Sequence, residues 1–116
     1  MLCNLAMDVV YFRQATGKEP VRQYIDKLPS EVAAYVLAAI KDIKEHGLDK
    51  ALVTCRQIEG KLWEIKIDAQ RVFYVVIDGP TMVLLHAYKK QGQKAPKKEI
   101  SVAKKRMKLV IGGHYA

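Results

Sequence analysis

The sequence is poor in cysteine. It contains two cysteines in 116 residues, Cys3 and Cys55, with no CxxC pair and no neighbouring histidine cluster. This excludes a disulfide-stapled scaffold and a zinc finger, and we expect two free thiols in a reducing cytoplasm. The sequence also lacks a metal-ligand spacing, a phosphate-binding glycine loop and a nucleophilic serine elbow. We therefore predict no metal and no cofactor.

Long hydrophobic runs are absent as well. No apolar stretch is long enough to cross a bilayer, so we expect no membrane span. The apolar opening, MLCNLAMDVVYF, has no basic lead and no small-residue cleavage site after it, so we expect no secretory signal. The chain is 50% hydrophobic and 28% charged, which is typical of a folded domain. Its length predicts a single domain over residues 1–116.

Acidic residues are scarce in one segment. Between His86 and Lys108 there are nine Lys and Arg residues and one acid, whereas the rest of the chain has eleven of each sign. The formal net charge of +8 therefore belongs to this segment. Such a concentration of charge suits binding to a polyanion such as nucleic acid. The alternative is a solvated basic helix that only aids solubility.

Apolar spacing predicts a strand and two helices in the first half. A β-branched and aromatic run over residues 8–13 indicates a strand. Helical periodicity follows from Pro20 to Leu28 and from Glu31 to His46, and Gly47 is placed to end the second helix. Because the link between these helices is short, they should form an antiparallel hairpin that covers an apolar surface.

The second half predicts an antiparallel meander and a basic helix. Strands are expected over residues 61–68, 71–77 and 81–88, joined by tight turns. The basic helix begins at Pro96 and presents Ile100, Ala103, Met107 and Val110 to the core. The predicted fold is therefore α+β, with an N-terminal helical hairpin packed on a small antiparallel sheet and a C-terminal helix beside it.

Charged and polar side chains gather on the predicted strands. Counting outward from the turn at Gly79 puts Arg71 near the level of Tyr88 and Lys89. An arginine fork can hold a phosphate, and a lysine can stabilise its charge or transfer a proton if like charges lower its pKa. Tyr88 or His86 could stack on a base or move a proton. The cluster consists of Glu64, Lys66, Arg71, His86, Tyr88, Lys89 and Lys90.

Structural roles are the alternative for several of these residues. Glu64 could serve only as an ion-pair partner of a nearby cation, and His86 and Tyr88 could be half-buried packing residues. We assign Trp63 to the core, because it shares a strand face with Ile65. Lys97 and Lys98 lie at the positive end of the last helix, where a bound phosphate would relieve their repulsion, although exposed lysines there cost only tenths of a kcal/mol.

Three blocks of the sequence resemble a known family. GKLWEIKI, QRVFYVVIDG and VLLHAYKKQGQKAPKKEISVAKKRM are similar to the phage-derived, HigB-type toxins of the RelE/ParE superfamily, over about Val9 to Leu109. The first block matches a G-L-W-E-like pattern and the second contributes Arg71. The third is the most specific, and its matching residues are His86, Tyr88, Lys89, Lys90, Pro96, Glu99, Ile100 and Ala103.

The resemblance implies a RelE-like fold and a toxin of a type II toxin–antitoxin pair. Such toxins are usually metal-independent, ribosome-dependent mRNA endoribonucleases of the cytoplasm, so the implied partners are mRNA, the ribosome and a helix-turn-helix, HigA-like antitoxin. By position, Arg71 with Lys89 or Lys90 would act on the phosphate, and Glu64, His86 or Tyr88 would transfer protons. The residues expected to grip RNA are Lys66, Lys94, Lys97, Lys98, Lys105 and Lys108.

Two other functions fit the same pattern. ParE-like relatives bind DNA gyrase without cutting RNA, and their action would give a DNA damage response with intact mRNA. A non-toxic basic RNA-binding module would show salt-sensitive RNA binding without growth arrest.

Overall fold

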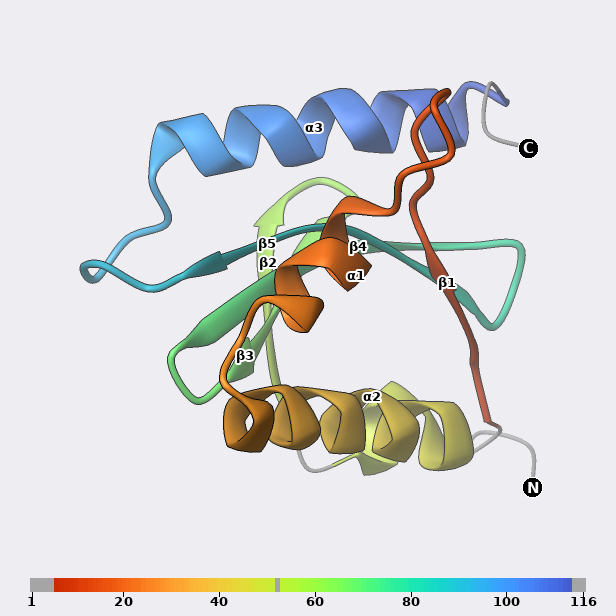
Figure 1. Ribbon diagram of the computed structural model, residues 1–116. Coiled ribbons are helices and arrows are strands. Elements are labelled where there is room, and N and C mark those ends of the chain that lie inside the picture. The colour runs from red at the N-terminus through yellow and green to blue at the C-terminus, as the bar shows by residue number, and fades with distance from the viewer. Residues whose placement is uncertain (1–5, 52, 114–116) are drawn as a thin grey trace.

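A β-sheet forms the centre of the molecule, with helices on both faces (Figure 1). The computed structural model describes residues 6–51 and 53–113. In chain order the elements are β1 (Asp8–Tyr11), α1 (Pro20–Asp26), α2 (Ser30–Lys50), β2 (Thr54–Glu59), β3 (Leu62–Ile67), β4 (Gln70–Ile77), β5 (Thr81–Lys89) and α3 (Lys97–Ile111).

The sheet is mixed. Within the described residues it has five strands in the order β1-β5-β4-β3-β2. The run from β2 to β5 is an antiparallel meander, and β1 adds to the β5 edge in parallel, with Val10 paired with Val83. A parallel neighbour requires a long crossover, and here α1, α2 and the other strands provide it.

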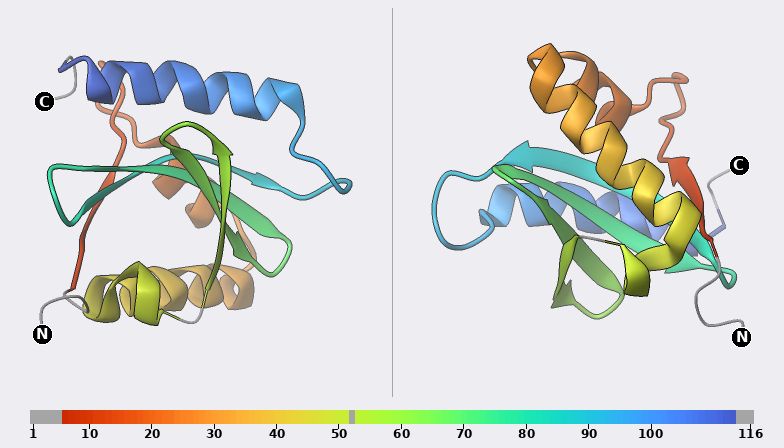
Figure 2. Two further views of the ribbon diagram at one scale, coloured as in Figure 1. Left: turned by 180° about the vertical axis from the view of Figure 1, so that it is seen from behind. Right: turned by 90° about the horizontal axis from the view of Figure 1, so that it is seen from below.

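Two apolar layers hold the helices to the sheet. On one face, Ile25 of α1 and Ile43 of α2 pack with sheet residues such as Ile65. On the other face, Ala103 and Val110 of α3 pack with residues that include Phe73. Figure 2 shows α3 on one side of the sheet and α2 on the other. The predicted apolar stripe of α3 is confirmed, because Ile100 and Met107 join the same cluster.

The fold predicted from sequence is wrong in its sheet. A small antiparallel sheet beneath an N-terminal hairpin was expected, whereas the sheet has a parallel edge strand and an additional strand, β2, among the described residues. β2 was missed because TCRQIE has few β-branched residues and contains a bulge between Gln57 and Glu59. β1 precedes the helices, and its pairing with β5 depends on contacts far apart in the chain.

Several local expectations are settled by the backbone. Gly47 adopts φ 77°, as predicted for a helix stop, but a further helical turn continues beyond it to Lys50. Cys55 is a free thiol, and Cys3 lies outside the described residues. In the described part of the chain, no helix is long and apolar enough to span a membrane.

Candidate active site

A row of polar side chains crosses the α3 face of the sheet. Lys66 pairs with Arg71, and Arg71 pairs with Tyr88. Directly paired residues on neighbouring strands project to the same face, and Tyr88 belongs to the apolar cluster that packs against α3. The row therefore lies on the α3 side, at the end of the sheet where β5 leads into the loop before α3 (Figure 1).

A β-bulge puts Tyr88 beside Arg71. The pairing of β4 with β5 shifts by one residue, because Phe73 pairs with His86 whereas Tyr74 pairs with Leu84. Without this shift, the register would place Ala87 opposite Arg71. Bulges re-aim side chains in this way and are common next to active sites. The prediction that Arg71 lies near the level of Tyr88 and Lys89 is confirmed, although the residue count behind it assumed no bulge.

Beneath this row lies a buried carboxylate. Glu64 has no exposed surface, and it accepts a 2.8 Å hydrogen bond from the Tyr88 hydroxyl and a 2.9 Å bond from Nη2 of Arg56. Burial, and then the hydrogen bond to Glu64, raises the pKa of Tyr88 above its ordinary value, while Arg56 and Arg71 oppose the rise. Tyr88 is therefore a protonated phenol at neutral pH.

Basic side chains gather beside Tyr88. A small concavity is lined by five basic side chains, by Tyr88 and by loop residues 92–95, and among the described residues no Asp or Glu lines it. We call it the basic concavity. Closely grouped cations without a lining acid favour binding of an anion such as a phosphate. Its five basic residues are Arg56, Lys66, Arg71, Lys90 and Lys94.

Arg71 is held rigidly at the wall of the basic concavity. The residue is 8% exposed, and its Nη1 donates to the carbonyl oxygens of Asp68, at 2.6 Å, and Gln70, at 2.9 Å. Asp68 has φ 54° in the turn between β3 and β4, so Arg71 also clamps that turn. A guanidinium carries five N–H donors, and the carbonyl contacts occupy only one of its two terminal nitrogens.

One known protein family matches the part of the chain that builds this site. The protein-family model described as "Phage derived protein Gp49-like (DUF891)" matches residues 23–108, which include every basic residue of the concavity. The chain belongs to this Gp49-like family. The family is RelE/HigB-like, is associated with toxin–antitoxin systems and is linked at family level to toxin endoribonuclease activity. The family match therefore supports the resemblance to RelE/HigB-like toxins at the level of the family. No curated protein matches the chain.

Lys89 of this Gp49-like protein lies outside the basic concavity. It pairs with Gln70, whose side chain is bonded to Tyr24 of α1 on the opposite face of the sheet. Side chains alternate along a strand, so Lys89 points away from Tyr88. Arg71 and Lys89, which were predicted to act together, therefore project from opposite faces of the sheet. Lys90 lines the concavity with Arg71.

His86 joins β5 to α3 instead of lining the concavity. Its Nε2 lies 2.6 Å from Oε1 of Glu99, Nη1 of Arg106 lies 3.3 Å from its Nδ1, and its ring stacks on Phe73. Burial lowers the pKa of His86, the hydrogen bond to Glu99 opposes this, and Arg106 lowers it further. A neutral ring that donates from Nε2 and accepts at Nδ1 satisfies both contacts.

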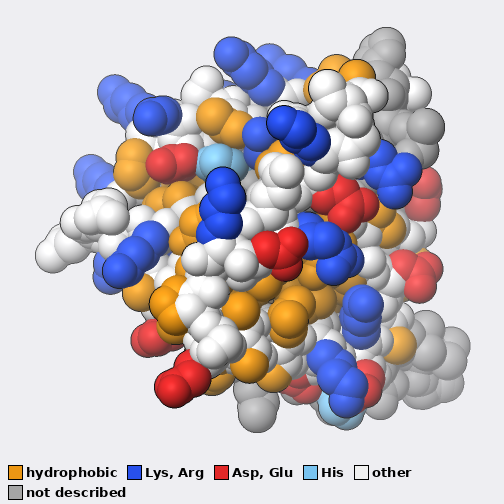
Figure 3. Space-filling model, viewed as in Figure 1, with side chains coloured by type: hydrophobic (Ala, Val, Ile, Leu, Met, Phe, Trp, Pro, Cys, Tyr) orange, Lys and Arg blue, Asp and Glu red, His pale blue; other side chains and the backbone are white. Residues whose placement is uncertain are grey.

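The lysines of α3 form a separate basic surface. A shallow hollow along the helix is lined by Lys97, Lys104, Lys105 and Lys108, and Lys104 is ion-paired with Glu59 at 2.8 Å. Lys98 is exposed nearby but does not line this hollow. Figure 3 shows Lys and Arg side chains gathered over α3 and the loop that precedes it. Of the lysines predicted to grip RNA, only Lys66 and Lys94 lie in the basic concavity.

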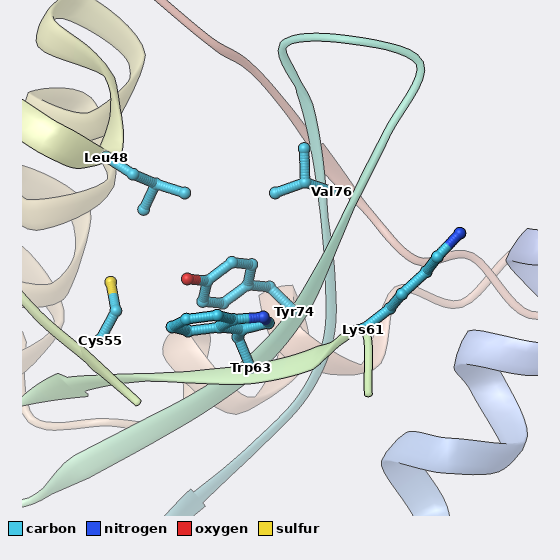
Figure 4. A pocket seen from close by; sticks show the side chains of 6 residues that line it. All are labelled: Leu48, Cys55, Lys61, Trp63, Tyr74 and Val76. Atoms are coloured by element: carbon cyan, nitrogen blue, oxygen red, sulfur yellow. The ribbon is translucent and has the colours of Figure 1, made fainter. Parts of the chain in front are cut away.

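An apolar hollow lies on the opposite face of the sheet. Its volume is about 390 Å³, and Figure 4 shows Trp63 and Tyr74 side by side in it, with Leu48 and Cys55 on the α2 side. Trp63 is 37% exposed, so its assignment to the core is wrong. α2 does not cover this part of the sheet. The hollow has one lysine, Lys61, at its rim, so it does not suit a phosphate.

One basic residue of the concavity was missed in the sequence. Arg56 lies on β2, which was not predicted as a strand, so nothing placed it beside Glu64. The local sequence TCRQIE carries only a weak strand signal, because it has few β-branched residues. The described residues contain no group of three or more His, Cys, Asp or Glu side chains that could hold a metal ion.

Proposed function

We propose that this Gp49-like protein is the toxin of a type II toxin–antitoxin system and cuts mRNA on the ribosome without a metal ion. The observation that carries the proposal is the basic concavity, where five cations and the Tyr88 hydroxyl meet above a buried carboxylate. RNA can be cleaved by such a set because its 2′-hydroxyl is an internal nucleophile. The protein must align that hydroxyl, move its proton and stabilise charge on the phosphate oxygens.

Charge stabilisation is the task of the cations. Arg71 and Lys90 hold the non-bridging oxygens of the scissile phosphate, and Lys66 supports them from β3. Lys90 takes this role and Lys89 does not, because only Lys90 shares the concavity with Arg71. Fixed donors of this kind act strongly where water is excluded, and Arg71 is fixed by its two carbonyl contacts.

Proton transfer follows the Tyr88–Glu64 hydrogen bond. The 2′-hydroxyl gives its proton to the Tyr88 oxygen as the Tyr88 proton moves to Glu64, and the 2′-oxygen attacks the phosphorus. The bond to the 5′-oxygen breaks, and that oxygen takes a proton from the Lys90 ammonium. The products are a 2′,3′-cyclic phosphate and a 5′-hydroxyl end. Glu64 then passes its proton back to the Tyr88 oxygen while the proton taken from the 2′-hydroxyl leaves to solvent, and Lys90 takes a proton from solvent.

The proposed partners are those that the family resemblance implies, and the positive charge of the surface suits them. mRNA in the ribosomal decoding site brings the scissile phosphate, and the exposed α3 lysines contact surrounding RNA phosphates in the cytoplasm. A helix-turn-helix antitoxin inhibits by covering the basic concavity with an acidic or apolar segment. Chemical labelling of Lys90 and Lys94 in the complex tests this, because full accessibility of both would contradict it.

The test of the proposed function is translation-dependent cleavage of a reporter mRNA by wild type and by Arg71→Ala. We expect cuts with 5′-hydroxyl ends only when the message is translated, and a loss of about 10²–10³-fold in Arg71→Ala. Intact mRNA together with a DNA damage response on expression would instead identify a ParE-like gyrase inhibitor. RNA binding without cleavage or growth arrest would identify a non-toxic binding module.

A further inference from the structure

Arg56 stands opposite Arg71 across the basic concavity. It lies on β2, the edge strand, and pairs directly with Glu64 of β3, whereas Arg71 comes from β4 on the other side of β3. Both arginines line the same small hollow, together with Lys66 between them. Two guanidinium groups from different strands therefore border one space.

The Arg56 side chain is held by the buried Glu64 and is partly exposed to solvent. Its Nη2 donates to Oε1 of Glu64, while 40% of its side chain remains exposed and Glu64 has no exposed surface. The bond to Glu64 requires one of the five N–H donors of a guanidinium. Nε is buried without a hydrogen-bond partner in the described structure, so the donors available to a ligand are on the terminal nitrogens.

Stability alone is a poor reason for this arrangement. Burying a carboxylate costs desolvation energy that its ion pair offsets only in part, and an apolar residue often serves as well. Both hydrogen bonds of the buried Glu64 carboxylate go to groups of the same concavity, since Oε2 accepts from the Tyr88 hydroxyl and Oε1 accepts from Arg56. The carboxylate thus fixes one cation and one hydroxyl of the basic concavity.

We propose that Arg56 is a second arginine ligand of the scissile phosphate, and that buried Glu64 is its positioning residue. This inference rests on the proposed function for the identity of the phosphate. Arg56 and Arg71 would hold the phosphate from opposite sides, with fork-shaped donors that a lysine cannot reproduce. Arg56 is then a catalytic residue, because it contacts the reacting group, and Glu64 acts on the phosphate only through Arg56 and Tyr88.

The experiment compares Arg56→Gln with a matched control, Arg13→Gln. Arg13 is an exposed arginine with its own acidic partner, Glu19, outside the concavity. Binding of a short single-stranded RNA is measured at several salt concentrations, and translation-dependent mRNA cleavage is measured in parallel. Arg56→Gln should lower the slope of log affinity against log salt by about 0.7 more than the control does. It should also reduce kcat by about 10²-fold.

Arg56→Lys tests the positioning. A lysine keeps the charge, so the salt slope should return to that of wild type, but one ammonium cannot engage Glu64 and a phosphate as a fork does. We therefore expect kcat to stay at least about tenfold low. The chemical-shift dispersion of an NMR spectrum establishes that each variant is folded.

The inference is overturned if folded Arg56→Gln matches Arg13→Gln in salt slope and in cleavage, or if Arg56→Lys restores kcat fully. A wild-type protein that cleaves no translated mRNA, but whose RNA binding still depends on Arg56, would overturn the proposed nuclease function. That result would leave Arg56 as a phosphate ligand.

Discussion

The hydroxyl of Tyr88 donates a 2.8 Å hydrogen bond to Glu64, a carboxylate with no exposed surface. The bond links β5 to β3 across β4, and it points the phenol oxygen at the edge of the basic concavity. It also gives the oxygen a place to send its proton. Tyr88, which could be a packing residue alone, thus has a direct role in the chemistry we propose.

Tyr88→Phe should separate chemistry from folding. Loss of the hydroxyl removes the proton path and leaves the ring in place, so cleavage should fall by about 10²-fold and stability by about 1 kcal/mol. The measurements are kcat with translated mRNA and urea denaturation. Tyr24→Phe is the control, because Tyr24 also donates a side-chain hydrogen bond, to Gln70, but on the opposite face. Equal cleavage by the two variants would contradict the role of Tyr88.

Glu64→Gln should lower both stability and cleavage. The amide has one acceptor oxygen for two donors, Tyr88 and Arg56, and its own NH2 group would face one of them. We expect a loss of about 2 kcal/mol in the free energy of unfolding, measured in urea. Glu31→Gln, at an exposed acid in the first turn of α2, should cost only tenths of a kcal/mol. A neutral effect of Glu64→Gln would show that the buried network is dispensable.

The lowered pKa of His86 predicts a pH dependence of stability. The folded state resists protonation of this ring, so below about pH 6.5 the unfolded state binds more protons. Stability contributed by neutral His86 is therefore complete above that pH and declines as pH falls toward the folded pKa. Melting temperatures from about pH 7.5 to 5.5 should fall more steeply for wild type than for His86→Gln. Parallel curves would show that His86 titrates as it does in the unfolded chain.

The α3 lysines should affect binding more than chemistry. Lys105 and Lys108 border a hollow distinct from the basic concavity, so the double change to Gln should raise KM and leave kcat within about twofold. The RNA-binding salt slope should fall by up to about 0.7 for each lysine. A fall in kcat at saturating ribosomes, with KM unchanged, would place these lysines in the reacting site.

The sequence was informative where local pattern decides structure. The turn at Gly79 was enough to put Arg71 near the level of Tyr88, and the β-bulge sets their direct pairing. The stripe through Ala103 correctly predicted the face of α3 that packs on the sheet. Where long-range pairing decides structure, the sequence was misleading. The parallel contact of β1 with β5 and the irregular strand β2 carry weak local signals.

Two errors in the site arise from how the strands pair. Arg56 was overlooked because strand β2 was not predicted. Lys89 was grouped with Arg71 because the two lie at a similar height along the sheet, although their side chains project from opposite faces. The bulge opposite Phe73 fixes these faces. A bulge depends on how two strands pack, so residue counting within one strand does not predict it.

Adjacent lysines provide the most direct measurement of the central claim, that the basic concavity is where the phosphate is cut. Lys90 lines the concavity and Lys89 projects from the opposite face. The measurement is the rate of translation-dependent mRNA cleavage by Lys90→Ala and Lys89→Ala at saturating ribosomes. We predict a loss of about 10²-fold or more for Lys90→Ala and a rate within about twofold of wild type for Lys89→Ala. Loss of cleavage in Lys89→Ala with an active Lys90→Ala, or equal rates for both variants, would contradict the account.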